Sequence, residues 1–285
     1  MSEVKTVPGV FTRRDPLNTA HPVVFDSPHS GDQYPADFEF DVPLEMLRMT
    51  EDAHVDELYG AAPEHGATLL HAHFPRALID LNRHPLDLDA ELLDAPWPDA
   101  LQPSRKSEVG MGLIRRVAKD GVPMYRRPLS VAEVRQRIEQ YYNPYHDELS
   151  SIIEGMHQRF GVVWHINCHS MRSALGRNPR PPTWKPNFIV SNRDGDTSDE
   201  PFLKFIGDFF RARGHTVLVN RPFKGGEIVR RHGDPGNNRH SVQIEINRKI
   251  YMDEVTLEKH EGFPVLQEQL NQLICEICDY ATRAL

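Results

Sequence analysis

The chain alternates short apolar segments, which have the length of buried strands, with longer segments in which apolar residues recur at helical spacing. The strand-like segments are residues 23–25, 68–70, 77–81, 162–168, 188–190, 217–219 and 242–246. The helical segments are residues 44–65, 130–160, 199–210 and 264–284, and Pro144 predicts a kink in the second of them. Strands interleaved with helices predict a layered α/β fold, in which ligands bind beyond the carboxyl ends of the strands.

The composition narrows the class of protein. Apolar residues make up 39% of the 285 residues and charged residues 26%, which is ordinary for a globular protein. No internal repeat or low-complexity linker divides the sequence, so we expect residues 1–285 to form a single domain. A net charge of -8 argues against binding of nucleic acid, and no apolar run approaches the ~18 residues of a membrane span. Three cysteines without framework spacing, and a beginning without an apolar leader, favour a cytoplasmic location.

Polar residues follow four of the strand-like segments at the point where each segment ends. The first is followed by His29, the segment 77–81 by Asn82 and Arg83, and the segment 162–168 by His169. The last segment carries Glu245 among apolar neighbours, where a carboxylate is costly unless it is paired or lies near a cation. We therefore expect these side chains to meet at one edge of the sheet and to suit a divalent metal.

His29 and His169 supply two of the three protein ligands that a catalytic zinc site typically uses. The third is expected to be a carboxylate from residues 50–56, just after the first strand. Asp52 is the preferred candidate, because it would return toward His29, and Asp56, one turn later, is the alternative.

Other reactive side chains fit less well. Cys168 adjoins His169, but neighbouring residues of a strand point to opposite faces, so we expect Cys168 to lie in the core. His71 and His73 share one strand face but lack a third partner nearby. Cys275 and Cys278 lie three residues apart on the last helix without a second pair, which is typical of core packing.

Six short segments in order resemble the N-formylglutamate amidohydrolase family. They span about residues 22–252 and read SPHSG at 27–31, EDAHVDEL at 51–58, DLNR at 80–83, YNPYH at 142–146, NCHSM at 167–171 and QIEINR at 243–248. The family is similar in fold to zinc carboxypeptidases, and the resemblance implies a mixed central sheet flanked by helices, a phosphorylase/hydrolase-like architecture.

The resemblance also implies roles for individual residues. His29, Asp52 and His169 resemble the metal ligands, for zinc (Zn2+) or another divalent metal, and Glu245 resembles the general base and acid. Asn82 and Arg83 resemble the group that holds a substrate carboxylate, and Arg172 is a candidate for the other carboxylate or for the oxyanion.

The implied reaction is metal-dependent hydrolysis of N-formyl-L-glutamate, a small anionic N-acyl amino acid, to L-glutamate and formate in histidine degradation. The alternatives are another N-acyl amino-acid deacylase or a carboxypeptidase on the same scaffold, or a binding protein without turnover.

Overall fold

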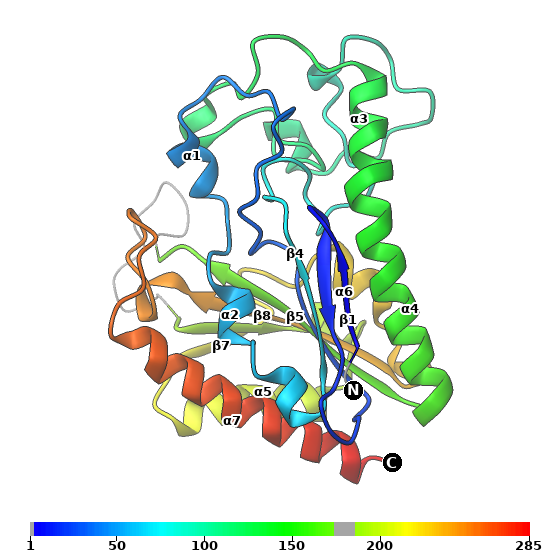
Figure 1. The fold of residues 1–285 in the computed structure, drawn as a ribbon, viewed down its shortest axis with the longest axis vertical. Coiled ribbons are helices and arrows are strands. Elements are labelled where there is room, and N and C mark those ends of the chain that lie inside the picture. Colours follow the sequence, from blue (N-terminus) through cyan, green and yellow to red (C-terminus); the bar gives the residue numbers. More distant parts are fainter. Residues whose placement is uncertain (1–2, 174–185) are drawn as a thin grey trace.

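The computed structural model describes residues 3–173 and 186–285, and its centre is one sheet of eight strands (Figure 1). The strand order across the sheet is β1-β2-β4-β3-β5-β8-β6-β7. The strands are β1 (Val4–Val7), β2 (Phe11–Arg14), β3 (Val23–Ser27), β4 (Thr68–Ala72), β5 (Val163–Met171), β6 (Phe188–Ser191), β7 (Val217–Val219) and β8 (Arg239–Asn247).

Four neighbouring strands at the middle of the sheet, β4, β3, β5 and β8, are parallel to one another. On either side the sheet becomes antiparallel, where β2 pairs with β4 and β6 pairs with β8. The predicted class, α/β with a mixed central sheet flanked by helices, is confirmed. Because the central strands are parallel, their carboxyl ends lie at one edge of the sheet.

Seven α-helices accompany the sheet in the described part of the chain. They are α1 (Leu44–Arg48), α2 (Val55–Leu58), α3 (Val131–Arg137), α4 (Asn143–Phe160), α5 (Glu200–Ala212), α6 (Glu227–His232) and α7 (Gly262–Arg283). Short 3-10 segments include Ala62–His65, Ala90–Leu92, Ser107–Val109, Lys119–Gly121, Arg193–Gly195, Pro235–Asn237 and Arg248–Ile250. A π-helical turn, Ile138–Tyr142, joins α3 to α4 and ends two residues before Pro144, where the sequence predicts a kink.

Two apolar layers hold the helices against the sheet. One layer joins one face of the central strands to α2, α5 and α7, of which α5 and α7 lie below the sheet in Figure 1. The other layer joins the opposite face to α3, α4, Ile228 of α6 and the loops between residues 74 and 129. The sheet is therefore covered on both faces, as parallel strands require.

The prediction of one helix over residues 44–65 is wrong. The segment forms α1, α2 and the 3-10 turn Ala62–His65, and His54 takes a left-handed φ of 65° between the helices. The Arg248 side chain donates hydrogen bonds to the main-chain carbonyls of Met49, at 2.9 Å, and of Glu51. In a continuous helix these carbonyls would accept hydrogen bonds from main-chain N–H groups one turn later. Here the Arg248 side chain takes the place of those N–H donors.

The prediction of a strand at residues 77–81 is also wrong. Its apolar residues Ala77, Leu78, Ile79 and Leu81 are buried, but the main chain folds through turns such as Leu78 N–H to Pro75 O and Arg83 N–H to Asp80 O. Strand β4 already pairs with β2 and β3. Residues 77–81 therefore find no free edge of β4 to pair with, and they pack as an irregular loop. The sequence reading also missed the β1–β2 hairpin and helix α6.

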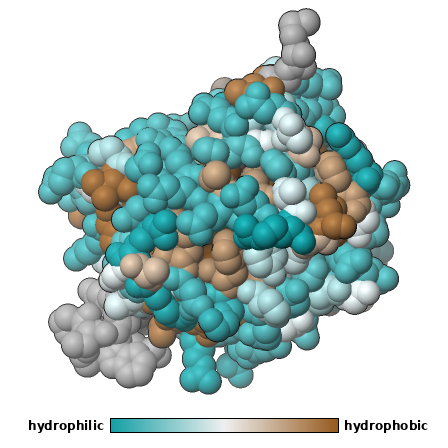
Figure 2. All heavy atoms as spheres, turned by 90° about the horizontal axis from the view of Figure 1, so that it is seen from below, coloured by the Kyte–Doolittle hydropathy of each residue, from teal (hydrophilic) through white to brown (hydrophobic). Residues whose placement is uncertain are grey.

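The surface carries isolated apolar side chains, and the face in Figure 2 is mainly hydrophilic with separate apolar patches. The exposed large apolar residues are Val4, Leu17, Leu44, Val109, Val122, Val255, Val265 and Leu285. No helix in the described part of the chain has both the length and the apolar character needed to cross a membrane.

Candidate active site and metal centre

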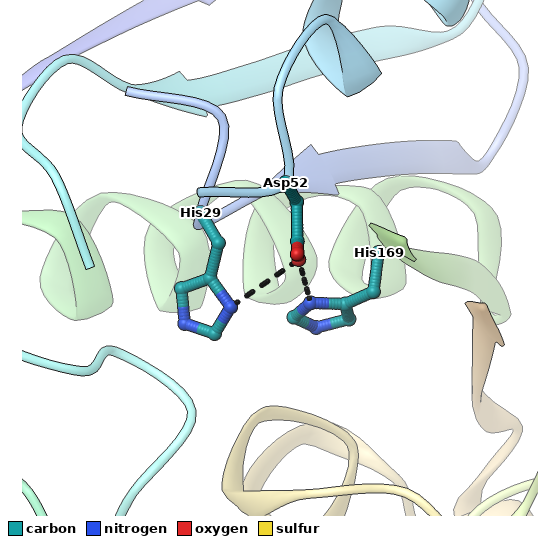
Figure 3. A group of neighbouring side chains, drawn as sticks. All are labelled: His29, Asp52 and His169. Atoms are coloured by element: carbon teal, nitrogen blue, oxygen red, sulfur yellow. Dashed lines mark hydrogen bonds and ion pairs between the residues drawn. The ribbon is translucent and has the colours of Figure 1, made fainter. Parts of the chain in front are cut away.

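His29, Asp52 and His169 point toward one another at the carboxyl edge of the sheet, and all three are buried (Figure 3). One ligand atom from each lies within 4.8 Å of the others. Asp52 Oδ2 is 2.9 Å from His169 Nδ1 and 3.5 Å from His29 Nδ1. Two imidazole nitrogens and one carboxylate oxygen are the donor types that catalytic zinc sites use, and at this spacing they could hold a metal ion.

Each member of this cluster is placed by its neighbours in the chain. His29 lies two residues after β3, and His169 lies near the end of β5. Asp52 lies in the loop between α1 and α2, and its N–H donates to the carbonyl of His29 at 2.9 Å. Arg248, which follows β8, donates from Nη2 to Asp52 Oδ1 at 3.0 Å, and this leaves Oδ2 facing the histidines.

The hydrogen bonding around His29 and Asp52 suits a divalent cation. His29 Nδ1 is buried and has no hydrogen-bond partner among the described residues, and this is costly for a polar ring in the interior. Burial opposes ionisation of Asp52, but interactions with His169 and His29 hold the pKa of its carboxyl well below its usual value. A negative carboxylate oxygen facing a buried imidazole nitrogen of this kind is an arrangement that suits a divalent cation.

The far nitrogens of the two histidines meet acceptors that orient the rings. His29 Nε2 lies 2.9 Å from Asp80 Oδ1, and His169 Nε2 lies 2.7 Å from Asn167 Oδ1. Asn167 in turn donates to the buried Asp26 at 2.8 Å. When Nε2 of each ring carries the proton, Nδ1 presents the lone pair that a metal requires.

Glu245 lies beside this cluster on β8, directly opposite His169 in the parallel pairing with β5. It is partly buried, and Gln243 Nε2 donates to its Oε1 at 2.8 Å. Burial raises the pKa of the Glu245 carboxyl to about 7; His169 opposes this shift and the negative charge of Asp52 adds to it. A carboxyl group that titrates near neutral pH is suited to accept and return a proton.

The alternation of residues along β5 and β8 explains why these polar groups share a face. On β5, Trp164, Ile166 and Cys168 enter the apolar layer with α5 and α7, while His165, Asn167 and His169 alternate with them. On β8, Val242, Ile244 and Ile246 enter the same layer, while Gln243 and Glu245 alternate with them. Since neighbouring side chains of a strand point to opposite faces, the polar residues face α4 and α6 together.

Asn82 and Arg83 reach the cluster from the irregular loop rather than from a strand. Asn82 Nδ2 lies 3.1 Å from His169 Nε2, and its Oδ1 accepts the N–H of Ile228 at 2.9 Å. Gly226, just before α6, approaches Asn82 so closely that an added Cβ would lie 2.3 Å from Asn82 Oδ1. Arg83 Nε is 3.9 Å from Asp80 Oδ2, and it is buried with no hydrogen-bond partner in the part of the chain that the structure describes. This guanidinium can therefore still bind an anion.

Other predicted candidates lie outside the cluster. Asp56 Oδ2 lies 3.6 Å from His71 Nδ1, away from His29 and His169. Cys168 packs in the apolar layer, where burial raises the pKa of its thiol well above the usual value, as expected for a core cysteine. Arg172 follows the end of β5, and no contact found among the described residues joins it to the cluster.

Sequence reasoning missed several charged residues that the structure places around the site. Asp80 contacts both His29 and Arg76, whose Nε lies 2.8 Å from Asp80 Oδ2, and Arg248 holds Asp52. Asp80 belongs to the DLNR segment. Arg76 lies four residues before it in the chain, in a stretch that does not form a helix. The sequence offered one clue to this contact. Asp80 stands among apolar residues, and a buried carboxylate requires a partner of opposite charge.

Comparisons with known proteins agree on one family. The family model described as N-formylglutamate amidohydrolase matches residues 21–252. The chain is 30% identical over 239 residues to an N-formylglutamate deformylase of Pseudomonas putida, covering 82% of each protein. It is 30% identical over 242 residues to that of Pseudomonas aeruginosa, covering 82% of this chain and 83% of the relative.

The fold is similar to a solved structure as well. The crystal structure of an N-formylglutamate amidohydrolase from Ralstonia eutropha JMP134 is 43% identical, with a TM-score of 0.92. The match covers 97% of this chain and 100% of that one.

Proposed function

The chain belongs to the N-formylglutamate amidohydrolase family, and on that premise we propose that it hydrolyses N-formyl-L-glutamate to L-glutamate and formate. The observation that carries the proposal is the convergence of His29, Asp52 and His169 beside Glu245 at one edge of the sheet. The relatives named above as deformylases support the choice of acyl group and amino acid.

His29, Asp52 and His169 would hold the metal, and zinc suits this donor set. When bound, zinc supplies a Lewis acid and lowers the pKa of a coordinated water toward ~7. The protein contributes a fixed ligand set, because Arg248, Asp80 and Asn167 hold the carboxylate and the two rings.

Glu245 is proposed to move the proton. As a carboxylate it accepts a proton from the attacking water, whose oxygen forms a bond to the formyl carbon. As a carboxylic acid it then returns that proton to the departing nitrogen, so the C–N bond breaks to give formate and the free amino group. Gln243 Nε2 donates a hydrogen bond to Glu245 Oε1 and so restricts the rotation of this carboxyl group.

Arg83, with Asn82 beside it, is proposed to hold the α-carboxylate of the substrate. A planar guanidinium can donate two parallel hydrogen bonds to a carboxylate, and Arg83 Nε is free to do so. Arg172 remains a proposal for the oxyanion, because its place after β5 puts it near the metal ligand His169 in sequence.

The test is incubation of metal-analysed protein with N-formyl-L-glutamate, following formate release. We expect formate and L-glutamate in equal amounts, with activity lost on treatment with a chelator and restored by zinc. N-acetyl-L-glutamate, N-succinyl-L-glutamate and a peptide with a C-terminal glutamate serve as competing substrates. Faster turnover of any of these would reassign the enzyme to a deacylase or carboxypeptidase, and failure of all four would reject a hydrolase.

Arg83→Ala is expected to lower kcat/KM for N-formyl-L-glutamate by about 10- to 100-fold, the range of a lost charge-assisted hydrogen bond. The same change should have little effect on the α-amide of that substrate, which lacks the carboxylate. Arg126→Ala is the control, because Arg126 is exposed and pairs with Asp41 at 2.6 Å. Equal losses on both substrates would reject Arg83 as the carboxylate clamp.

A further inference from the structure

The site carries more positive charge than the metal ligands and one substrate carboxylate require. Arg76 is paired with Asp80 at 2.8 Å, while Arg83 lies 3.9 Å from the same carboxylate. The charges of Arg76, Asp80, Arg83 and Asp52 also act on the Arg115 guanidinium. Asp80, which also contacts His29, therefore has two arginines within 4 Å, and a third arginine lies within range of its charge.

The backbone tethers Arg115 to this place. The N–H of Asp80 donates to the carbonyl of Leu113 at 2.8 Å, and the N–H of Leu113 donates to the carbonyl of Asp87 at 2.7 Å. At Gly112 an added Cβ would lie 2.4 Å from the Asp87 carbonyl oxygen, so only glycine permits this close approach. The segment that carries Arg115 is thus held against the loop that carries Asp80, Asn82 and Arg83.

Arg115 lacks the partners that structural arginines have. Its Nε is buried without a hydrogen bond, and within the described residues no carboxylate oxygen lies within 4 Å of its guanidinium nitrogens. Burial, followed by repulsion from Arg76, lowers the pKa of Arg115 to about 10. Its neighbour Arg116 differs, since it contacts Asp89 at 2.6 Å and Glu91 at 2.8 Å. A cation kept in an unfavourable position without a partner is typical of a binding site.

We propose that Arg115 is the second anion-binding residue of the site, and that it binds the side-chain carboxylate of the substrate while Arg83 binds the α-carboxylate. The inference rests on the proposed function and deepens it. Selection of a dicarboxylic amino acid then comes from two separate guanidinium groups, and a substrate with one carboxylate leaves one of them buried and unpaired.

The test compares two substrates that differ only at the side chain, N-formyl-L-glutamate and N-formyl-L-glutamine. The variants are Arg115→Met, Arg115→Lys and the control Arg116→Met, all as zinc-loaded protein. We expect Arg115→Met to lower kcat/KM about 10- to 100-fold for the glutamate substrate and less than about threefold for the glutamine substrate, mainly through KM. Arg115→Lys should recover part of the preference, because a positive charge is retained.

Three results would overturn the inference. Equal losses on both substrates would give Arg115 a role in orienting the reaction or stabilising the oxyanion. If Arg115→Met left the preference for N-formyl-L-glutamate over N-formyl-L-glutamine unchanged, Arg115 would have no role in substrate selection. If Arg116→Met changed the preference in kcat/KM between the two substrates as much as Arg115→Met does, the loop rather than the Arg115 charge would be responsible.

Binding of glutarate and butyrate separates this inference from the proposed function, because neither compound can be hydrolysed. Calorimetry on the zinc-loaded wild type should show at least about tenfold tighter binding of glutarate, and Arg115→Met should abolish the difference. If this holds while no formate is released from any substrate, the proposed function fails and the second anion position stands. If formate is released but glutarate shows no dependence on Arg115, only the inference fails.

Discussion

Glu245→Gln is expected to keep its zinc and to lose about 10²- to 10⁴-fold in kcat on N-formyl-L-glutamate, the usual contribution of general acid–base catalysis. Glutamine has almost the same shape, and its carbonyl oxygen can still accept the hydrogen bond from Gln243 Nε2, now 2.8 Å from Glu245 Oε1. It cannot take a proton from water or return one to the departing nitrogen. The measurement is formate release beside the zinc content of the same preparation.

Glu154→Gln is the matched control for this change. Glu154 is a glutamate of α4 that pairs with Arg239, away from the metal cluster. It should leave both turnover and zinc content within about twofold of the wild type, as most surface substitutions do. Near-normal turnover of Glu245→Gln would remove Glu245 from the mechanism, and loss of zinc would instead make it part of the metal site.

His169→Ala is expected to weaken zinc binding by at least about 100-fold and to reduce formate release to background. The lower bound follows because loss of an outer hydrogen-bond partner alone typically weakens metal binding by about 10- to 100-fold, and His169 is proposed as a ligand itself. The substitution also removes the contact at 2.9 Å to Asp52 Oδ2, so the buried carboxylate loses its nearest partner. Zinc content after dialysis against buffered zinc gives the measurement.

His71→Ala serves as the histidine control. His71 lies on β4, and its Nδ1 is 3.6 Å from Asp56, outside the cluster of His29, Asp52 and His169. Zinc content and activity should therefore stay close to the wild type. If His71→Ala lost zinc while His169→Ala retained it, the metal centre would have to be moved to the His71 and Asp56 side of the fold.

Local patterns predicted most of the regular elements because they depend on residues close together in the chain. The parallel strands β3, β5 and β8 and the helices α5 and α7 follow apolar patterns that the sequence displays directly. The same patterns failed at residues 44–65 and 77–81. There, Arg248 holds the carbonyls of Met49 and Glu51, and β4 already has neighbours on both sides. Apolar spacing carries no information about either partner.

Local patterns likewise predicted some residues of the site and not others. The polar residues at strand ends, together with the family resemblance, pointed to His29, His169 and Glu245, and parallel strands bring such ends to one edge. The alternation along β5 and β8 could also have shown that His165, Asn167 and Gln243 share their face. Which nearby carboxylate joins the histidines could not be read from spacing, since Asp52 and Asp56 are one turn apart in an expected helix that does not form.

By itself, then, the order of residues determined the layered architecture and the supply of imidazole and carboxylate groups to one edge of the sheet, because strand alternation and chain direction are local properties. Only the folded chain decided that Asp52 rather than Asp56 meets His29 and His169. It also decided that Arg115 Nε is buried with no hydrogen-bond partner among the described residues, within range of the charges of Arg83 and Asp80. These outcomes depend on contacts such as Arg248 with Asp52 and Leu113 with Asp80. Such contacts form between segments far apart in the chain, where burial and charge pairing choose among side chains that the sequence presents as equivalent.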